Sequence, residues 1–465
     1  MGTQVNEMRL WAEHEFGCAV LGDQRRTRRL VDVACSIGHN PQGVLAPSFS
    51  NYAETKAAYR LFDSDAVEFS AVGANHWSNT EQRCRQPGEY LLIEDTSELD
   101  FTSHEAAQGL GHIGDTRGRG VLLHSTLALR IEDWTVHGET EVSVQGLLGQ
   151  VCWTRQDAPR KSHESRTQRM KRARESDRWG KLFEKLPPPS PKTEWTYMAD
   201  REGDIYETLL RCRGKEMGFI VRACQSRALE CDSRDVFEVV SVAPLLGKLQ
   251  VQLRARPGQP ARTARVSLRA TAVTLRPPYR YGTELHSISV NVVEAREEQA
   301  PPGIEPIHWV LLSSWPVETL AQVIRVVKTY GKRWLVEEFH KALKSGAHVE
   351  EIQLATLDRI EPLVALLSIV AIRLLSAKVM SSEKKETPLG PDDADPVMLK
   401  VLEAKLGKPV KHWTHGALLI AIARMGGFIS YNKTPGWKTI WRGWQFLSTL
   451  MQGYELAQGH KKCVQ

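Results

Sequence analysis

The stretch Tyr90-Leu91-Leu92-Ile93-Glu94-Asp95 decides the fold class of this chain. Four apolar residues precede two carboxylates, and short apolar runs of this kind are typical of buried strands. Comparable runs occupy residues 121–127, 195–198 and 218–221, and a helix-like pattern follows Gly203. Strands that alternate with helices predict an α/β core.

Two aspartates stand at the ends of these runs. Asp95 follows the run at 90–93, and Asp200 follows the run at 195–198. Side chains at strand ends can converge on one edge of a sheet, so the two carboxylates are candidates for a shared site. Taken singly, each is more typical of a helix cap or a turn.

A third acid lies in the segment Tyr330-Gly-Lys-Arg333-Trp-Leu-Val-Glu337-Glu-Phe-His-Lys-Ala-Leu-Lys344, which has no proline and is strongly helical by propensity. Its spacing places Tyr330, Arg333, Glu337 and Lys344 on one face of a helix. A face with these side chains does not belong to a core, so Glu337 joins the two aspartates as a candidate.

Two structural alternatives remain open for this helix. Glu337 could form a solvent-facing ion pair with Arg333 or Lys341, worth only a few tenths of a kcal/mol. Alternatively, Glu338 is the pairing acid and Glu337 is merely its neighbour. Spacing alone does not distinguish them.

The chain of 465 residues is longer than one hydrophobic core usually organises, so we expect two or three domains. Its 42% hydrophobic content is enough to bury their cores. The longest apolar run, 363–372, ends at Arg373 and is shorter than the roughly 20 residues of a membrane span. Early glutamates argue against a secretion signal. We therefore expect a cytoplasmic protein, and the scattered cysteines predict reduced thiols.

Positive charge is unevenly distributed, although the net charge is only +6. Residues 1–70 predict short helices with a basic face, with helix-start signals at Asp23 and at Asn51 with Glu54. Residues 155–178 carry nine Arg or Lys against four acids, which predicts a solvated segment with or without DNA contact. Residues 246–281 contain no acid and alternate apolar with basic positions, which favours antiparallel strands with a phosphate-facing cationic face. The basic residues of that stretch are Lys248, Arg254, Arg256, Arg262, Arg265, Arg269, Arg276 and Arg280.

The C-terminal part predicts a linker or exposed loop at 381–396, rich in Lys, Glu, Asp and Pro, followed by helices. Three tryptophans there, Trp437, Trp441 and Trp444, share one helix face. Core packing is the first interpretation of this stripe, and self-association is the second.

The residues resemble the bacterial DDE transposases of the insertion-sequence-four family. Three motifs carry the resemblance: Ile93-Glu94-Asp95-Thr96, Asp200-Arg201-Glu202-Gly203-Asp204-Ile205, and the Y-x2-R-x3-E-x6-K signature that begins at Tyr330. Further similar stretches begin at Leu21, Trp309 and Ile422, so the resemblance spans almost the whole chain in order.

This resemblance implies a fold and a domain order. It implies an RNase H-like mixed sheet flanked by helices at 71–375, with a basic β insertion at about 225–305. A helical domain at 1–70 would bind the DNA end, and a helical domain at 376–465 would dimerise.

The resemblance also implies a chemistry. Two Mg²⁺ ions, for which Mn²⁺ substitutes, would be held by Asp95, Asp200 and Glu337, with Asp95 bridging both ions. Such a pair of ions activates the attacking oxygen and stabilises the leaving oxygen in phosphodiester chemistry, and Mg²⁺ prefers carboxylate ligands. The partners would be double-stranded transposon ends, target DNA and a second copy of the chain.

Further residues acquire expected DNA contacts from the resemblance. Tyr330, Arg333 and Lys344 would hold a phosphate near the cleaved end, and Lys341 lies on the same segment. Trp309 would stack a base flipped out during DNA hairpin formation, although a buried strand aromatic is an equally good interpretation. Weaker candidates for DNA contact are Arg222, Arg25, Arg29 and Arg60.

Three other functions compete with a transposase. A non-catalytic transposition inhibitor is disfavoured because all three carboxylates and the basic N-terminal region are present. A glycosidase would need a sugar cleft, which the all-basic stretch at 246–281 argues against. An RNase H-like nuclease is the closest rival, and strand transfer to new DNA distinguishes the two.

Overall fold

The computed structural model describes residues 3–39, 45, 48–49, 51–115, 117–155, 165, 175–253, 259–279, 284–383, 385–390, 394–407, 409–429 and 435–460. Most of the basic segment predicted at 155–178 lies outside the described residues. Arg254, Arg256 and Arg280 of the second basic stretch lie outside them too.

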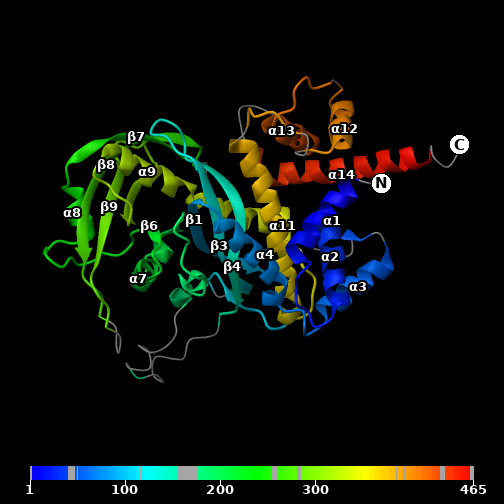
Figure 1. Cartoon of the computed structure of the whole chain (residues 1–465), viewed down its shortest axis with the longest axis horizontal. Helices are drawn as coiled ribbons and strands as arrows, with labels where there is room; N and C mark the ends of the chain where they lie inside the picture. The colour runs from blue at the N-terminus through cyan, green and yellow to red at the C-terminus, as the bar shows by residue number, and fades with distance from the viewer. Residues whose placement is uncertain are drawn as a thin grey trace.

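Within the described residues, ten strands form one sheet in the order β2-β3-β1-β5-β6-β10-β9-β8-β7, with β4 paired to β3 (Figure 1). Strands β1, β5 and β6 run parallel, and the remaining pairs are antiparallel. The strands are β1 (Gly88–Asp100), β2 (Gly111–Ile113), β3 (Gly118–Asp133), β4 (Glu141–Trp153), β5 (Thr193–Ala199), β6 (Gly218–Arg222), β7 (Leu245–Leu253), β8 (Arg262–Leu275), β9 (Ile288–Glu297) and β10 (His308–Ser313). The predicted α/β core is confirmed, and the strands from the basic stretch extend the same sheet.

Helices flank this sheet and form the two ends of the chain (Figure 1). The α-helices are α1 (Thr3–Phe16), α2 (Gln24–His39), α3 (Tyr52–Phe62), α4 (Phe69–Cys84), α6 (Lys181–Glu184), α7 (Tyr206–Gly214), α8 (Val236–Ser241), α9 (Leu320–Tyr330), α10 (Trp334–Lys341), α11 (Leu357–Glu383), α12 (Pro396–Leu406), α13 (His415–Met425) and α14 (Trp437–His460). Short 3-10 turns are η3 (Glu175–Arg178), η4 (Arg201–Gly203), η5 (Gly331–Arg333) and η7 (Val349–Glu351), and η6 (Ala342–Gly346) is a π-helical turn.

The predicted helix starts near the N-terminus are confirmed. The Asp23 carboxylate accepts a hydrogen bond from the Arg25 backbone N–H at 2.8 Å, where α2 begins. The Asn51 side chain accepts from the Glu54 N–H at 2.9 Å and caps α3. Each cap satisfies a backbone donor that has no partner within the helix.

A buried histidine attaches the N-terminal helices to the rest of the chain. His76 on α4 binds the Glu15 carboxylate of α1 through Nδ1 at 2.5 Å. Its Nε2 accepts from the Leu147 N–H of β4 at 3.0 Å. Because an accepting Nε2 carries no proton, the imidazole donates from Nδ1 to Glu15. One side chain therefore connects α1, α4 and β4.

The helical segment predicted at 330–344 is confirmed, but its helix is irregular. The 3-10 turn η5 tightens the chain after Tyr330, and the π-helical turn η6 widens it from Ala342 to Gly346. Both changes shift the angular position of later residues relative to a regular helix.

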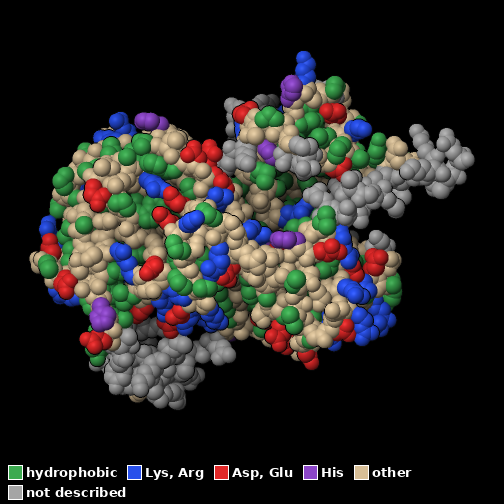
Figure 2. All heavy atoms as spheres, viewed as in Figure 1, with side chains coloured by type: hydrophobic (Ala, Val, Ile, Leu, Met, Phe, Trp, Pro, Cys, Tyr) green, Lys and Arg blue, Asp and Glu red, His purple; other side chains and the backbone are tan. Residues whose placement is uncertain are grey.

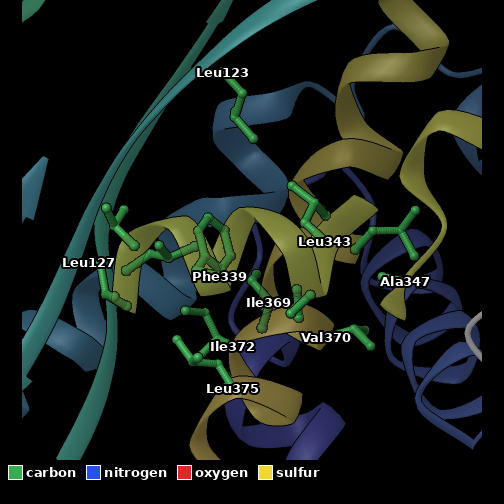
Figure 3. Packing of buried hydrophobic residues seen from close by; sticks show 14 of the residues in the cluster. Leu123, Leu127, Phe339, Leu343, Ala347, Ile369, Val370, Ile372 and Leu375 are labelled. Atoms are coloured by element: carbon green, nitrogen blue, oxygen red, sulfur yellow. The ribbon is translucent and has the colours of Figure 1, made fainter. Parts of the chain in front are cut away.

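Helix α11 lies in the main core, where residues 363–372 are all buried. Figure 3 shows Ile369, Val370, Ile372 and Leu375 packed near Phe339 and Leu343. Length and composition alone would let Leu357–Ser382 cross a membrane, but most of this stretch is buried inside the protein. Its hydrophobicity is accounted for by packing of a core helix.

The C-terminal prediction was partly wrong. Helix α11 continues to Glu383, so part of the predicted linker at 381–396 is helical. Trp437 and Trp441 are buried and Trp444 packs against a small apolar cluster, which confirms core packing for the stripe. Among the described cysteines all thiols are free, as predicted, and Cys463 lies outside the described residues.

Two glycines let α13 and α14 approach closely. A Cβ built on Gly426 would lie 1.9 Å from the Thr439 carbonyl oxygen, and a Cβ on Gly443 would lie 1.8 Å from the Ile422 oxygen. Since both obstacles are backbone atoms, a side chain here forces the helices apart.

We predict that Gly443→Ala lowers the free energy of unfolding of the C-terminal helices by about 1–3 kcal/mol, the usual cost of overpacking. The matched control is Gly453→Ala on the same helix, where nothing lies within 4 Å of the new Cβ. That change should be neutral or stabilise by up to about 1 kcal/mol, because alanine favours helices. Thermal unfolding of both variants checks this, and equal effects would contradict the close crossing.

Candidate active site

Parallel pairing of two strands brings Asp95 and Asp200 to the same place. Ile93 of β1 is paired in register with Met198 of β5. Each aspartate lies two residues beyond its member of this pair, at the same end of the sheet. Asp200 also caps η4 by accepting from the Glu202 N–H at 2.8 Å. The predicted placement of both residues at strand ends is thus observed for Asp200, whereas Asp95 lies within the longer strand β1.

The Asp95 carboxyl lies in an unfavourable electrostatic environment. Its pKa is raised to about 7, chiefly by burial and then by the charges of Asp200 and Glu337, while Arg333 opposes the rise. Carboxylates that share a site repel one another in this way. These couplings indicate that the three predicted acids lie near one another.

Glu337 is turned toward a cation. It accepts a short hydrogen bond from the Arg333 guanidinium, four residues earlier. Lys341 instead binds the neighbouring Glu338 at 3.2 Å. Both alternatives left open by the sequence are therefore realised in part, because each acid has its own basic partner.

The donor set suits a divalent cation, but the carboxylates do not converge in this geometry. Within the part of the chain that the structure describes, no group of three His, Cys, Asp or Glu side chains is close enough to hold a metal ion. Asp95 and Asp200 carry carboxylate oxygens on adjacent strands, and Glu337 is bound to Arg333. Hard divalent cations prefer such ligands.

Three predicted DNA contacts form a group around Tyr330. The Trp309 ring packs edge-on against the Tyr330 ring, with centroids 5.4 Å apart. Arg222 is paired with Leu311 across β6 and β10 and donates to the His308 carbonyl oxygen at 3.0 Å. The structure thus brings Trp309, Arg222 and Tyr330 together, with Trp309 only partly buried.

The charges in this group affect one another. Burial raises the pKa of Tyr330 to about 12, although Arg333 and Arg222 lower it. Burial lowers the pKa of Arg222, which also lies near Arg333. Burial opposes the charge on Arg333, but Tyr330 and Glu337 keep its pKa above the usual value. Two partly desolvated guanidinium groups are well suited to bind phosphate oxygens.

Lys344 lies in the π-helical turn η6, and its ammonium group is 3.3 Å from a Glu350 carboxylate oxygen. Its charge also acts on the buried His340, which lies beside Asp95. The predicted contact of Lys344 with DNA stays a prediction.

The cationic face predicted for 246–281 is partly neutralised. Strand β9 and the residue after it bring in three glutamates that are absent from the stretch itself. Arg262 pairs with Glu297, Arg269 lies 3.6 Å from Glu294, and Lys248 lies 3.7 Å from Glu298. The expected phosphate-facing role is therefore weakened at these three positions.

The N-terminal arginines lie on a basic surface. Figure 2 shows Lys and Arg side chains gathered in the region of α2 and α3. Arg25 is highly exposed and pairs with Asp23 at 2.8 Å, Arg29 lies 3.8 Å from Asp32, and Arg60 is exposed at the end of α3. This surface is distinct from the group around Tyr330.

Sequence reasoning missed several residues close to Asp95. His340 is buried with Nδ1 3.7 Å from the Asp95 carboxylate, and its Nε2 has no hydrogen-bond partner among the described residues. Burial lowers the pKa of His340 to about 3, so the ring is neutral. His340 lies three residues after Glu337, a helical spacing that could have identified it.

A second missed group lies behind the strand that carries Asp95. The fully buried Glu94 accepts from the Gly180 N–H at 2.7 Å and from the Thr126 hydroxyl at 3.1 Å. His124 bonds the Thr96 hydroxyl at 2.9 Å. The Thr96 N–H in turn donates to the Asp95 carboxylate at 2.9 Å. This network fixes the backbone on both sides of Asp95.

Residues 8–67 match a family model described as transposase DNA-binding. The match includes most of α1 and all of α2 and α3, the helices that carry Arg25, Arg29 and Arg60. This region of the chain is similar to the DNA-binding part of transposases. The match supports a transposase, which is a DNA-cutting enzyme, with DNA as its partner.

We predict that Asp95→Asn stabilises the metal-free protein at pH 8. The folded-state pKa of Asp95, about 7, lies above the ordinary 3.8. The neutral Asp95 carboxyl therefore contributes its full share to the free energy of unfolding below pH 3.8. This contribution is lost as the pH rises toward 7. The three-unit difference corresponds to roughly 4 kcal/mol at pH 8.

Chemical denaturation with a chelator, from pH 5 to pH 8, measures this effect. The advantage of Asp95→Asn should grow as the pH rises. A difference that does not change with pH would mean that Asp95 is not held in a repulsive, buried environment.

Proposed function

We propose that this chain is a DDE transposase of the insertion-sequence-four family that cleaves and rejoins DNA at the ends of its element. Its motifs are most similar to those of the transposase of transposon five. The observation that carries the proposal is the electrostatic coupling of Asp95 to both Asp200 and Glu337. A transposase DNA-binding match in the same chain supports it.

The sheet supports an RNase H-like core. Strands β4, β3 and β1 form an antiparallel group, and β5 and β6 continue it in parallel with β1. Helix α10 brings Glu337 toward the end of this sheet where the aspartates lie, as indicated by its charge acting on Asp95.

Asp95, Asp200 and Glu337 would hold two Mg²⁺ ions, or Mn²⁺ in their place. When bound, such ions supply Lewis-acid activation of the attacking and leaving oxygens. The chain contributes the three carboxylates, and Thr96 orients the Asp95 carboxylate through its backbone N–H. Release of Glu337 from Arg333 would free both side chains, one for the metal and one for a DNA phosphate.

The residues around Tyr330 would position the DNA end. Arg333 and Arg222 offer planar guanidinium groups to phosphate oxygens. Trp309, which is only partly buried, would present a ring for a flipped base, and Tyr330 supports that ring from its edge. Lys341 and Lys344 would add charge near the backbone of the DNA.

The remaining parts of the chain have roles in assembly. Helices α2 and α3 would bind the transposon end, and the helices after residue 394 would mediate pairing of two copies. From this activity we propose that the protein is bacterial and cytoplasmic. It would be associated with the nucleoid when it is bound to DNA.

We predict that Asp95→Asn, Asp200→Asn and Glu337→Gln each reduce metal-dependent cleavage roughly a thousandfold, since several kcal/mol of charge stabilisation are lost. Binding of the transposon end should remain. Glu194→Gln is the control, because Glu194 is an exposed acid on β5, the strand that ends just before Asp200. Gel assays of binding and cleavage check both, and full activity in any of the three variants would remove that residue from the site.

Joining of a 3′ hydroxyl to new DNA separates a transposase from a nuclease. Purified wild-type protein, Mg²⁺ and fragments from the flanks of its own element should yield strand-transfer products. Hydrolysis without joining would favour the nuclease instead.

We predict that Trp309→Ala slows hairpin formation about tenfold more than first-strand nicking, because stacking on an aromatic ring is worth about 1–3 kcal/mol per base. Time courses of nicked and hairpin products measure the two steps. An equal loss at both would show that Trp309 only supports Tyr330 by packing.

A further inference from the structure

A buried ion cluster lies one residue beyond Glu337. The Glu338 carboxylate accepts from the Lys378 ammonium at 2.6 Å, from the Trp437 indole N–H at 3.0 Å and from Lys341 at 3.2 Å. Only 6% of Glu338 is exposed. Its partners come from three helices, α10, α11 and α14.

The Glu338 carboxylate at the centre of the cluster is charged, and it is largely buried together with Lys378. Burial raises the pKa of Glu338, but Lys378 and Lys341 outweigh it, and the pKa lies below the usual value. The Lys378 ammonium also lies over the Trp437 ring, 4.2 Å from its centroid. Each of the three residues Glu338, Lys378 and Trp437 therefore contacts the other two. A buried charge that lost such partners would be strongly disfavoured.

Helix α10 thus faces two parts of the molecule. Successive side chains on a helix point about 100° apart. Glu337 binds Arg333 and its charge acts on Asp95, whereas Glu338 points toward α11 and α14. Helix α14 also contacts the π-helical turn η6, which carries Lys344. Helix α14 therefore contacts both α10, through Trp437, and the turn that carries Lys344.

We propose that Glu338 is a positioning residue that couples the docking of the C-terminal helix α14 to the placement of Glu337. The coupling rests on the proposed metal-dependent function for its effect on activity. Docking of Trp437 fixes the rotation of α10, and through it the direction of the Glu337 carboxylate. Loss of the Trp437 contact frees α10 to rotate, so Glu337 reaches the aspartates less often.

The chain offers a matched pair of variants. Trp437→Phe removes the indole N–H that Glu338 accepts. Trp441→Phe makes the same change one turn further along α14, where the indole N–H is buried and has no hydrogen-bond partner in the described part of the chain. Both remove similar ring area, so a loss of packing alone affects both.

The first readout is the Mg²⁺ concentration that gives half-maximal first-strand cleavage of bound transposon ends. Trp437→Phe should raise it about tenfold, as expected when a contact that orients a metal ligand is lost. Trp441→Phe should leave it unchanged, and both variants should bind the ends as the wild type does. Equal shifts in the two variants, or none in Trp437→Phe, would overturn the coupling.

The second readout does not depend on activity. Hydrogen exchange of the backbone amides at 334–346 in the full chain should accelerate in Trp437→Phe and not in Trp441→Phe. If the wild type cleaves no DNA, the proposed function fails, and the exchange rates still decide the coupling. Unchanged exchange in Trp437→Phe would overturn the coupling even in an active transposase.

Discussion

The parallel pairing of β1 with β5 constrains the rest of the site. It holds Asp95 and Asp200 side by side, each two residues beyond the last pair of the two strands, where their charges cannot separate. Burial makes the repulsion stronger, because water is no longer available to screen it. The charge of Arg333 partly offsets this repulsion at Asp95. His340 also lies beside Asp95, but its ring is neutral and adds no charge. A site under such strain is stabilised by any cation that enters it.

The same constraint gives the helices around the sheet their roles. The segment of α10 and η6 lies between the sheet and α11, as the packing of Phe339 and Leu343 shows (Figure 3). On α10, Glu337 pairs with Arg333, and the adjacent Glu338 is bonded to Lys378 of α11 and Trp437 of α14. The residue proposed as a metal ligand and the contact with the C-terminal helix are therefore neighbours on one short helix.

Local patterns in the sequence predicted much of this fold. The strands at 90–93 and 195–198 and the caps at Asp23 and Asn51 follow from short apolar runs and side-chain chemistry within a few residues. What failed depends on contacts distant in sequence. Glutamates of β9 and the residue after it neutralise basic residues of β7 and β8, and Glu338 finds partners 40 and 99 residues away. The π-helical turn at Ala342–Gly346 has no signature in local propensity.

The central claim is that Asp95, Asp200 and Glu337 form one metal site. Its most direct test is the anomalous diffraction of Mn²⁺ in crystals of the chain bound to a cleaved transposon end. We predict manganese between Asp95 and Asp200, with the Glu337 carboxylate turned away from Arg333 and joining them. Manganese bound elsewhere, or Glu337 still paired with Arg333 while DNA and metal are both present, would contradict the account.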